Sequence, residues 1–118
     1  MASDRVELGV ELLGKLEFES IPLPEAVDRL ETVTADPATQ RRILDLAVER
    51  GLVEREGGSI RPRSGAFVRF ASEVVSKDGE FSCRRCGAEL STGYFIKLDA
   101  GELGPFGSSC VRKVTGRE

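Results

Sequence analysis

The three cysteines are the residues of this chain whose type and spacing could perform chemistry. Cys83 and Cys86 are separated by two residues and are followed directly by Gly87. Two thiolates at this spacing can hold one tetrahedral metal ion, and the glycine permits the tight turn that follows them. Cys110 lies near the predicted start of the last helix, where the helix dipole favours a thiolate. Together the three cysteines predict a zinc site.

The ligand set is incomplete for a structural zinc site, which normally has four protein ligands. The chain has no histidine and no fourth cysteine. A water molecule, a second chain or a side-chain oxygen would have to fill the remaining position, the oxygen coming from Asp99, Glu102, Ser108 or Ser109. Two other interpretations stay open: a degenerate finger that keeps its fold without metal, and redox chemistry by the C-x-x-C pair. Redox chemistry is disfavoured because the pair does not sit in a βαβ pattern.

Composition indicates an ordinary globular chain of one compact domain or two very small ones. The chain has 118 residues, of which 40% are hydrophobic and 31% are charged. No apolar run approaches the ~20 residues that a membrane span needs, and the first residues lack the basic-then-apolar pattern of a signal peptide. An odd number of cysteines argues against a closed disulfide framework. We therefore expect a cytoplasmic protein that does not bind membranes.

The elements that precede the cysteines are predicted to be helical. Apolar residues recur at helical spacing in segments 3–18 and 24–33, and a third helix is expected over 36–50. The third helix has the clearest boundaries. Asp36 can cap its free amides, Pro37 suits its first turn, and Gly51 follows where a left-handed conformation would end it.

A short hairpin is expected directly after the third helix. Two strand-like pieces flank Gly57 and Gly58, which form a hairpin turn signal. Three helices followed by a tight, arginine-bearing hairpin is the order of the winged helix-turn-helix, and we expect this domain over residues 1–65. The segment AVERGLVEREGGSIRP resembles the junction between recognition helix and wing in many archaeal and bacterial winged-helix regulators.

Positive charge is concentrated in the middle of the chain. The net charge of the whole chain is −3, whereas residues 41–69 hold seven arginines against four acidic residues, a net of +3. In helix-turn-helix proteins the first half of the recognition helix enters the major groove, and wings touch the backbone. The expected nucleic-acid contacts are therefore Thr39, Gln40, Arg41, Arg42, Arg55, Arg61 and Arg63.

Two alternatives to nucleic-acid binding follow from the same residues. The arginines would equally pair with neighbouring acidic side chains on a solvated surface, and winged helices also serve as protein-binding modules. We therefore weigh a DNA-binding transcriptional regulator against a protein-interaction adaptor, with the apolar first helix as a candidate homodimer contact. An enzyme is not expected, because no nucleophile–base pair, cofactor loop or convincing carboxylate pair is found.

The C-terminal third differs in character from the rest. Residues 66–80 are expected to form a connecting strand or linker with a turn at 77–80, and residues 81–118 a small cysteine module. A strand pair interrupted at 91–93 and a short helix capped by 108–109 are predicted within the module. A knuckle, a hairpin and a cysteine at a helix start resemble the treble-clef class of zinc finger. The predicted fold class is therefore α+β, a winged helix-turn-helix followed by a zinc-finger-like hairpin and helix.

With both halves in view, the chain resembles an uncharacterised group of small haloarchaeal proteins. The shared segments are DRVELGVELL near the start, RRILD and ERG in the middle, and FSCRRCGAELSTGYFI with LDAGELGPFGSSC towards the end. The resemblance covers nearly the whole chain. It implies this two-part architecture and a salt-adapted cytoplasm, but it implies no reaction.

Overall fold

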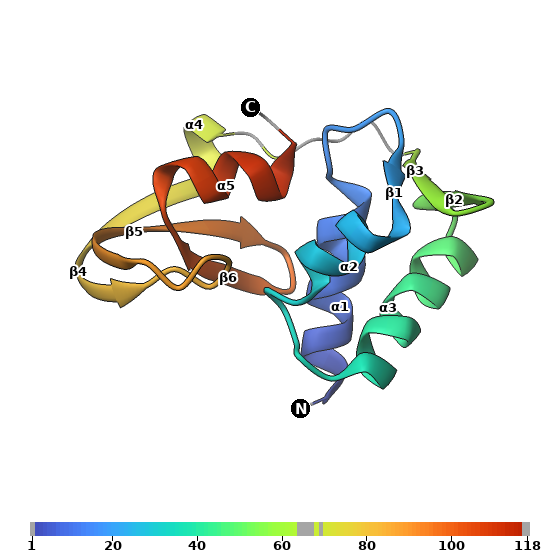
Figure 1. The fold of residues 1–118 in the computed structure, drawn as a ribbon, viewed down its shortest axis with the longest axis horizontal. Helices are drawn as coiled ribbons and strands as arrows, with labels where there is room; N and C mark the ends of the chain where they lie inside the picture. Colours follow the sequence, from blue (N-terminus) through green and yellow to red (C-terminus); the bar gives the residue numbers. More distant parts are fainter. Residues whose placement is uncertain (1, 64–67, 69, 117–118) are drawn as a thin grey trace.

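The fold consists of a helical part, residues 2–63, and a β-rich part, residues 70–116, that pack side by side. The structure is a computed structural model that describes residues 2–63, 68 and 70–116. Figure 1 shows the elements in chain order. Their bounds are α1 Ala2–Gly14, β1 Ile21–Pro22, α2 Leu23–Leu30, α3 Pro37–Glu49, β2 Val53–Glu56, β3 Ser59–Pro62, α4 Phe70–Glu73, β4 Val74–Ser82, β5 Glu89–Leu98, β6 Gly101–Phe106 and α5 Ser108–Thr115.

The first two helices are shorter than their hydrophobic patterns predict. α1 ends at Gly14 rather than at residue 18, and α2 ends at Leu30 rather than near Val33. The apolar residues beyond each end remain in the core, since Leu16 and Val33 are fully buried. A hydrophobic pattern records burial, and turn residues can be buried as well as helical ones.

Local signals place α3 where the sequence predicts it. The Asp36 carboxylate accepts a hydrogen bond from the Thr39 N–H at 3.1 Å, and Pro37 opens the helix. Gly51 has a φ of 72°, which an L side chain rarely adopts. The predicted cap, first turn and left-handed end of this helix are therefore confirmed.

α3 packs against α1 through an unusually close contact at Gly9. A Cβ atom added to Gly9 would lie 2.5 Å from Cδ1 of Ile43, a fully buried residue of α3. Only glycine therefore lets the two helices approach this closely, and the contact fixes how α3 is presented to solvent.

We expect Gly9→Ala to destabilise the protein by about 1–2 kcal/mol. Overpacking costs about 1–3 kcal/mol, and the better helix propensity of alanine offsets up to ~1 kcal/mol of this. Urea unfolding monitored by circular dichroism would measure the change. Gly58→Ala is the matched control, because nothing lies within 4 Å of a Cβ atom there. A Gly9→Ala protein more stable than the wild type would mean that the helices do not pack this tightly.

The small sheet beside these helices has the order β1-β3-β2, with both pairs antiparallel. The predicted hairpin across Gly57 and Gly58 is confirmed, and Arg55 lies opposite Ile60 in its register. The third strand, β1, is not predicted from the sequence. It has only two residues, and it is a strand because Ile21 pairs with Ile60.

The larger sheet has the order β4-β5-β6 and corrects two predictions. The expected turn at residues 77–80 lies inside β4, which pairs with β5 on both sides of a register shift between Asp78 and Phe81. The expected break at 91–93 lies inside β5, which is a single strand. Gly93 is buried there, and a Cβ atom on it would lie 2.8 Å from Pro105. Both turn-like segments accommodate close packing within strands.

Two further predictions concern the ends of the β-rich part. Residues 70–73 form the short helix α4 rather than an extended connector, whereas the strand predicted for 74–77 is confirmed; the expectation for residues 66, 67 and 69 lies outside the described residues. The last helix is not capped by Ser108 or Ser109. Its N-cap is Gly107, without a side-chain hydrogen bond.

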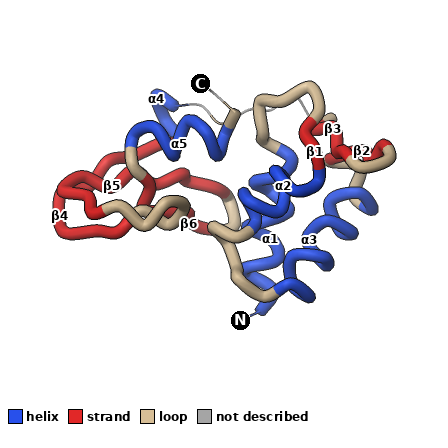
Figure 2. Tube along the Cα trace, in the orientation of Figure 1, coloured by secondary structure: helices blue, strands red, loops and turns tan. Residues whose placement is uncertain are grey.

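Helix α5 joins the larger sheet to the helical part. It lies over the larger sheet in Figure 2, where the strands form two groups at opposite ends of the molecule. Its C-terminal carbonyls accept hydrogen bonds from residues early in the chain, with Glu17 N–H donating to Thr115 at 2.8 Å and Arg29 Nη2 to Lys113 at 2.9 Å. None of the helices among the described residues has the length and apolar character that crossing a lipid bilayer requires.

Candidate metal centre and arginine surface

The C-x-x-C segment forms a closed turn between β4 and β5. The Cys83 N–H donates to the Ala88 carbonyl at 2.8 Å, and the Gly87 N–H donates back to the Cys83 carbonyl at 2.9 Å. Gly87 has a φ of 78°, which explains the glycine after the second cysteine. The Arg84 N–H fastens the turn to the strand β6 by donating to the Pro105 carbonyl at 2.9 Å.

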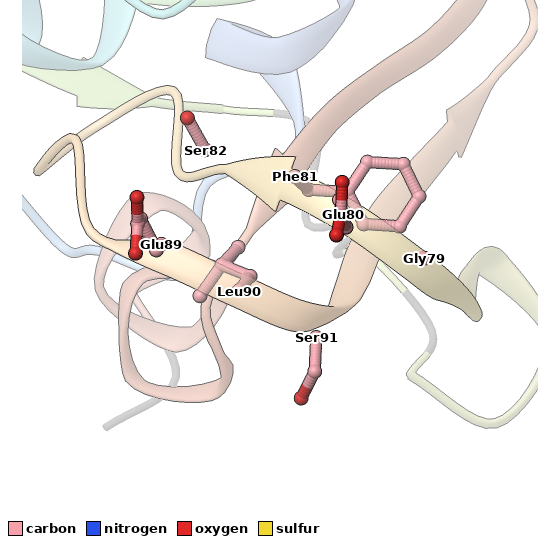
Figure 3. Close-up of a pocket in the computed structure, with 7 residues that line it drawn as sticks. All are labelled: Gly79, Glu80, Phe81, Ser82, Glu89, Leu90 and Ser91. Carbon is pink, nitrogen blue, oxygen red and sulfur yellow. The ribbon is translucent and has the colours of Figure 1, made fainter.

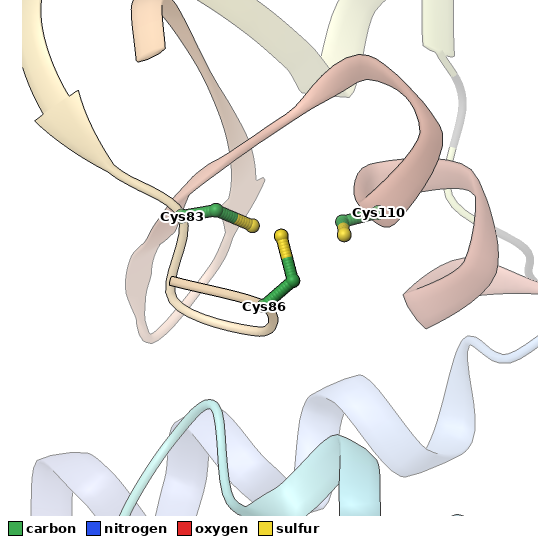
Figure 4. Close-up of side chains that lie close together, drawn as sticks. All are labelled: Cys83, Cys86 and Cys110. Carbon is green, nitrogen blue, oxygen red and sulfur yellow. The ribbon is translucent and has the colours of Figure 1, made fainter. Parts of the chain in front are cut away.

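The three sulfur atoms meet in one place, as the sequence predicts. Cys110, the third residue of α5, brings its sulfur to those of Cys83 and Cys86, and all three lie within 4.8 Å of one another. Figure 4 shows the three side chains pointing toward a common point. Cys83 and Cys110 are buried, and Cys86 is exposed. The arrangement can hold a metal ion by three thiolates.

The surroundings prepare one of the thiols for ionisation. Burial disfavours the Cys83 thiolate, but backbone N–H groups of Cys86, Gly107 and Arg85 and the Cys86 thiol donate to its sulfur. The net effect lowers the pKa of Cys83 from 9.0 to about 7. Burial raises the pKa of Cys110, as do its hydrogen bonds with the other two thiols, and Arg85 opposes that rise. Thiolates, not thiols, bind metals, so Cys83 is the natural first ligand.

No fourth cysteine, histidine or carboxylate joins this cluster among the described residues. Asp99 and Glu102 lie at the end of the β5–β6 hairpin that is remote from the cysteines, and Glu102 forms an ion pair with Lys77 at 2.9 Å. Both carboxylates are therefore excluded as ligands in this fold. Ser108 and Ser109 are exposed at the start of α5, beside Cys110. The residues present fit a thiophilic ion such as zinc with one position open to an oxygen ligand or water.

The two arginines inside the C-x-x-C segment connect the cluster to α2 and to the turn that follows it. Arg84 Nε donates to the Thr32 carbonyl at 2.8 Å, and Arg85 Nε donates to the Asp28 carboxylate at 3.2 Å. Arg85 Nη1 also lies 4.0 Å from the Cys110 sulfur. Sequence reasoning missed these contacts. The only signal was the presence of two consecutive arginines between two ligands, and nothing local identifies partners more than 50 residues away.

The seven residues expected to contact nucleic acid differ in what the structure leaves available. Gln40 is buried, and its Nε2 donates to the Thr34 carbonyl at 2.9 Å, so it has a structural role. The Thr39 hydroxyl donates to Asp36 at 2.6 Å. On the hairpin the arginines are paired across the strands, Arg61 with Glu56 at 3.6 Å and Arg63 with Glu54 at 3.9 Å.

The remaining three residues, Arg41, Arg42 and Arg55, are exposed and form what we call the arginine surface. Within the described part of the chain, none of the three has a hydrogen bond or an ion pair. Arg41 and Arg55 flank a groove of about 390 Å³ between α2, α3 and β2, whose apolar lining includes Leu23, Val27 and Leu44. α3 and the hairpin thus present exposed positive charge that, among the described residues, is unpaired, and Arg41 and Arg55 share their groove with Asp45.

A second hollow, of about 620 Å³, lies along β4 and β5 near the cysteines (Figure 3). Its lining includes two exposed carboxylates, Glu80 and Glu89, and two exposed serines, Ser82 and Ser91. No cysteine or arginine lies in this lining, so it adds nothing to the metal cluster.

Comparison with known proteins gives one result. No curated protein and no solved structure matches the chain. A family model described as a family of unknown function, DUF5830, matches residues 5–118. That span includes the helical part, the three cysteines and the arginine surface. The chain belongs to the DUF5830 family of unknown function.

Proposed function

We propose that residues 5–63 form a winged helix-turn-helix that binds duplex DNA, and that the protein is a transcriptional regulator. The order α1, β1, α2, α3, β2, β3 and the sheet order β1-β3-β2 support this assignment. In this scheme α2 and α3 are the helix-turn-helix, α3 is the recognition helix, and the hairpin β2–β3 is the wing.

The arginine surface is the observation that carries the proposal. Most arginines among the described residues have a partner: for example, Arg50 forms two hydrogen bonds with Glu7 at 2.7 and 2.8 Å. Four arginines of that part have none: Arg41, Arg42, Arg55 and Arg112. Three of the four lie on α3 and β2. An unpaired guanidinium keeps its full capacity to donate to phosphate or to a base edge, so these three are the favoured DNA contacts.

The paired arginines of the hairpin have a lesser role in this proposal. Glu54 and Glu56 already accept from Arg63 and Arg61, and a phosphate would have to displace them. The net charge of −3 is compatible with binding because residues 1–40 carry nine acidic against three basic residues, whereas residues 41–69 carry a net charge of +3. DNA affinity depends on the charges that face the phosphates, rather than on the sum over the chain.

We also propose that the cysteine cluster holds zinc as a structural ion. The support is the convergence of three cysteine sulfur atoms, two from the closed turn around Cys83 and the third from near the start of α5. This arrangement resembles that of a treble-clef module. When bound, zinc would tie the β4–β5 turn to α5, and a water molecule or a serine oxygen would complete four-coordination.

Salt dependence tests the DNA-binding proposal directly. We expect the zinc-loaded wild type to bind a mixed-sequence duplex with an affinity whose logarithm falls linearly with the logarithm of salt concentration. The slope should be about −3, because three phosphate-facing arginines each contribute roughly −0.9. Fluorescence anisotropy across a salt series measures it. A folded protein without affinity for any duplex at low salt would refute the proposal.

A protein-interaction adaptor is the second candidate, and one observation favours it. The groove beside the arginine surface has an apolar lining that includes Leu23, Val27 and Leu44. On α3, which forms one wall of the groove, Val48 is also 39% exposed. Such a groove would fit an apolar side chain of a partner. A stoichiometric partner that survives nuclease treatment, together with no duplex affinity, would favour this candidate.

A further inference from the structure

The turn between α2 and α3 is held by three side chains from three parts of the chain. Three successive carbonyls each accept one hydrogen bond. Arg84 donates to Thr32 at 2.8 Å, Arg5 Nη1 donates to Val33, and Gln40 Nε2 donates to Thr34 at 2.9 Å. Arg5 belongs to α1, Gln40 to α3 and Arg84 to the C-x-x-C segment.

The same turn therefore links the cysteine cluster to the arginine surface. Arg84 lies between Cys83 and Cys86, and its N–H donates to the Pro105 carbonyl at 2.9 Å, so a metal held by the two cysteines adds a further restraint to its backbone. On the other side of the turn, Gln40 is the residue directly before Arg41 in α3. The path from the C-x-x-C segment to the arginine surface therefore begins with the Arg84 side chain, continues through the backbone of residues 32–34 and ends with the Gln40 side chain.

Metal binding changes the interactions at the start of this path. Three thiolates around a divalent ion carry a net charge of −1, whereas three thiols carry none. Arg85 lies between this centre and α2, 4.0 Å from the Cys110 sulfur and 3.2 Å from the Asp28 carboxylate. Loading the centre places negative charge beside Arg85 and fixes the turn that holds Arg84. The loaded and metal-free proteins thus differ in the interactions that hold α2 and the α2–α3 turn, which is the condition for a ligand to shift an equilibrium.

We propose that occupancy of the cysteine cluster by zinc controls the DNA affinity of the arginine surface, through the contact between Arg84 and the α2–α3 turn. The inference rests on the proposed DNA-binding function and adds its regulation. Zinc holds Arg84 against the Thr32 carbonyl, the turn holds Gln40, and α3 is kept in the orientation that presents Arg41 and Arg42. The metal-free protein loses this restraint on α3 and binds DNA more weakly.

The test compares zinc-loaded and chelated full-length protein, kept reduced. Anisotropy gives the affinity for a mixed-sequence duplex, and hydrogen exchange reports protection of residues 31–42. In the wild type we expect zinc to raise the affinity about tenfold, within the usual range for coupled sites, and to increase protection in 31–42. In Arg84→Ala the zinc effect on affinity should fall below about threefold, while zinc content stays at the wild-type level. Arg112→Ala, an exposed arginine with no partner among the described residues, is the matched control and should behave like the wild type.

A second variant interrupts the same path at its other end, on α3, where no cysteine is affected. Gln40→Met removes the donor to Thr34 and lies on α3, so it leaves the ligands in place, and it should also lose the zinc effect. This variant decides the matter if Arg84→Ala loses zinc or fails to fold. Equal duplex affinity and equal protection of 31–42 with and without zinc in the wild type would overturn the coupling and leave the proposed function standing.

The opposite failure is also distinguishable. If neither form of the wild type binds duplex DNA, the proposed function fails, and hydrogen exchange alone decides the coupling. The coupling would be supported if zinc increases the hydrogen-exchange protection of 31–42 in Arg112→Ala but not in Arg84→Ala. Equal protection with and without zinc in the wild type would overturn the coupling. Should chelation unfold the chain, the zinc-loaded proteins are compared instead. Arg84→Ala should then bind about fivefold more weakly than Arg112→Ala, and equal affinities would overturn the coupling.

Discussion

Replacing Arg41 and Arg42 together by alanine is expected to weaken binding to duplex DNA by ~100-fold, about 3 kcal/mol, since contacts of this kind are worth about 1–3 kcal/mol each. Both side chains are exposed on α3 and, within the described residues, have no partner. The substitution should therefore leave the free energy of unfolding unchanged within about 0.5 kcal/mol. Anisotropy at low salt measures the affinity, and urea unfolding measures the stability.

The hairpin supplies a matched control with the same change in charge. Arg61 and Arg63 are also exposed, but each is paired with a glutamate. Arg61→Ala/Arg63→Ala should weaken binding by less than about tenfold, because these guanidinium groups are already engaged and contribute little free energy to a new contact. Equal losses in the two double variants would show that binding depends on total charge and not on α3.

Replacing Cys110 by serine is expected to abolish stoichiometric zinc binding and to lower the melting temperature by roughly 15 °C. A ligand present at a thousand times its Kd stabilises the folded state by about 4 kcal/mol, and for a chain of this size 1 kcal/mol corresponds to about 4 °C. The side chain of Cys110 is buried beside those of Cys83 and Cys86, so its loss leaves two thiolates, only one of them buried. Metal analysis of freshly purified protein and calorimetry measure the two effects.

Ser109→Ala is the control for that experiment. Ser109 is exposed, and it precedes Cys110 directly. Its replacement should keep one zinc ion per chain if water fills the fourth position, whereas a marked loss of zinc affinity would identify the serine oxygen as a ligand. A wild type that is purified without metal, and whose melting temperature does not respond to zinc or to a chelator, would instead establish the metal-free finger.

The predictable parts of the fold are those specified by local chemistry. Asp36, Pro37 and Gly51 set the bounds of α3 through a cap, a first turn and a left-handed end, all of which act within a few residues. The two-residue strand β1 was not predictable, since it exists only because Ile21 meets Ile60. The glycine-containing segments of β4 and β5 look like turns in the sequence, and they lie within strands because the residues around them pair with the neighbouring strand, with a register shift between Asp78 and Phe81.

The candidate sites also divide into features that follow from neighbouring residues and features that depend on distant contacts. The convergence of the three cysteines follows from a C-x-x-C spacing and a cysteine near a helix start, and both are local features. The sequence analysis places Gln40 among the expected nucleic-acid contacts, because it is a polar residue in the first half of the expected recognition helix. It is buried because the α2–α3 turn folds over it and accepts its hydrogen bond. The contacts of Arg84 with the α2–α3 turn and of Arg85 with α2 could not be identified, because the partners are distant in the sequence.

The order in which the chain is synthesised has a consequence for its assembly. The last turn of α5 is fastened to the helical part, through the Thr115 and Lys113 carbonyls that accept from Glu17 and Arg29. The ribosome makes residues 5–63 first, and their buried apolar residues belong to one core that is completed by residues made later. Cys110 and the rest of α5 emerge after them, and α5 then docks onto this part of the chain. A nascent chain that stalls before α5 would expose both that docking surface and two unpaired thiols, which makes it a ready substrate for quality-control proteases.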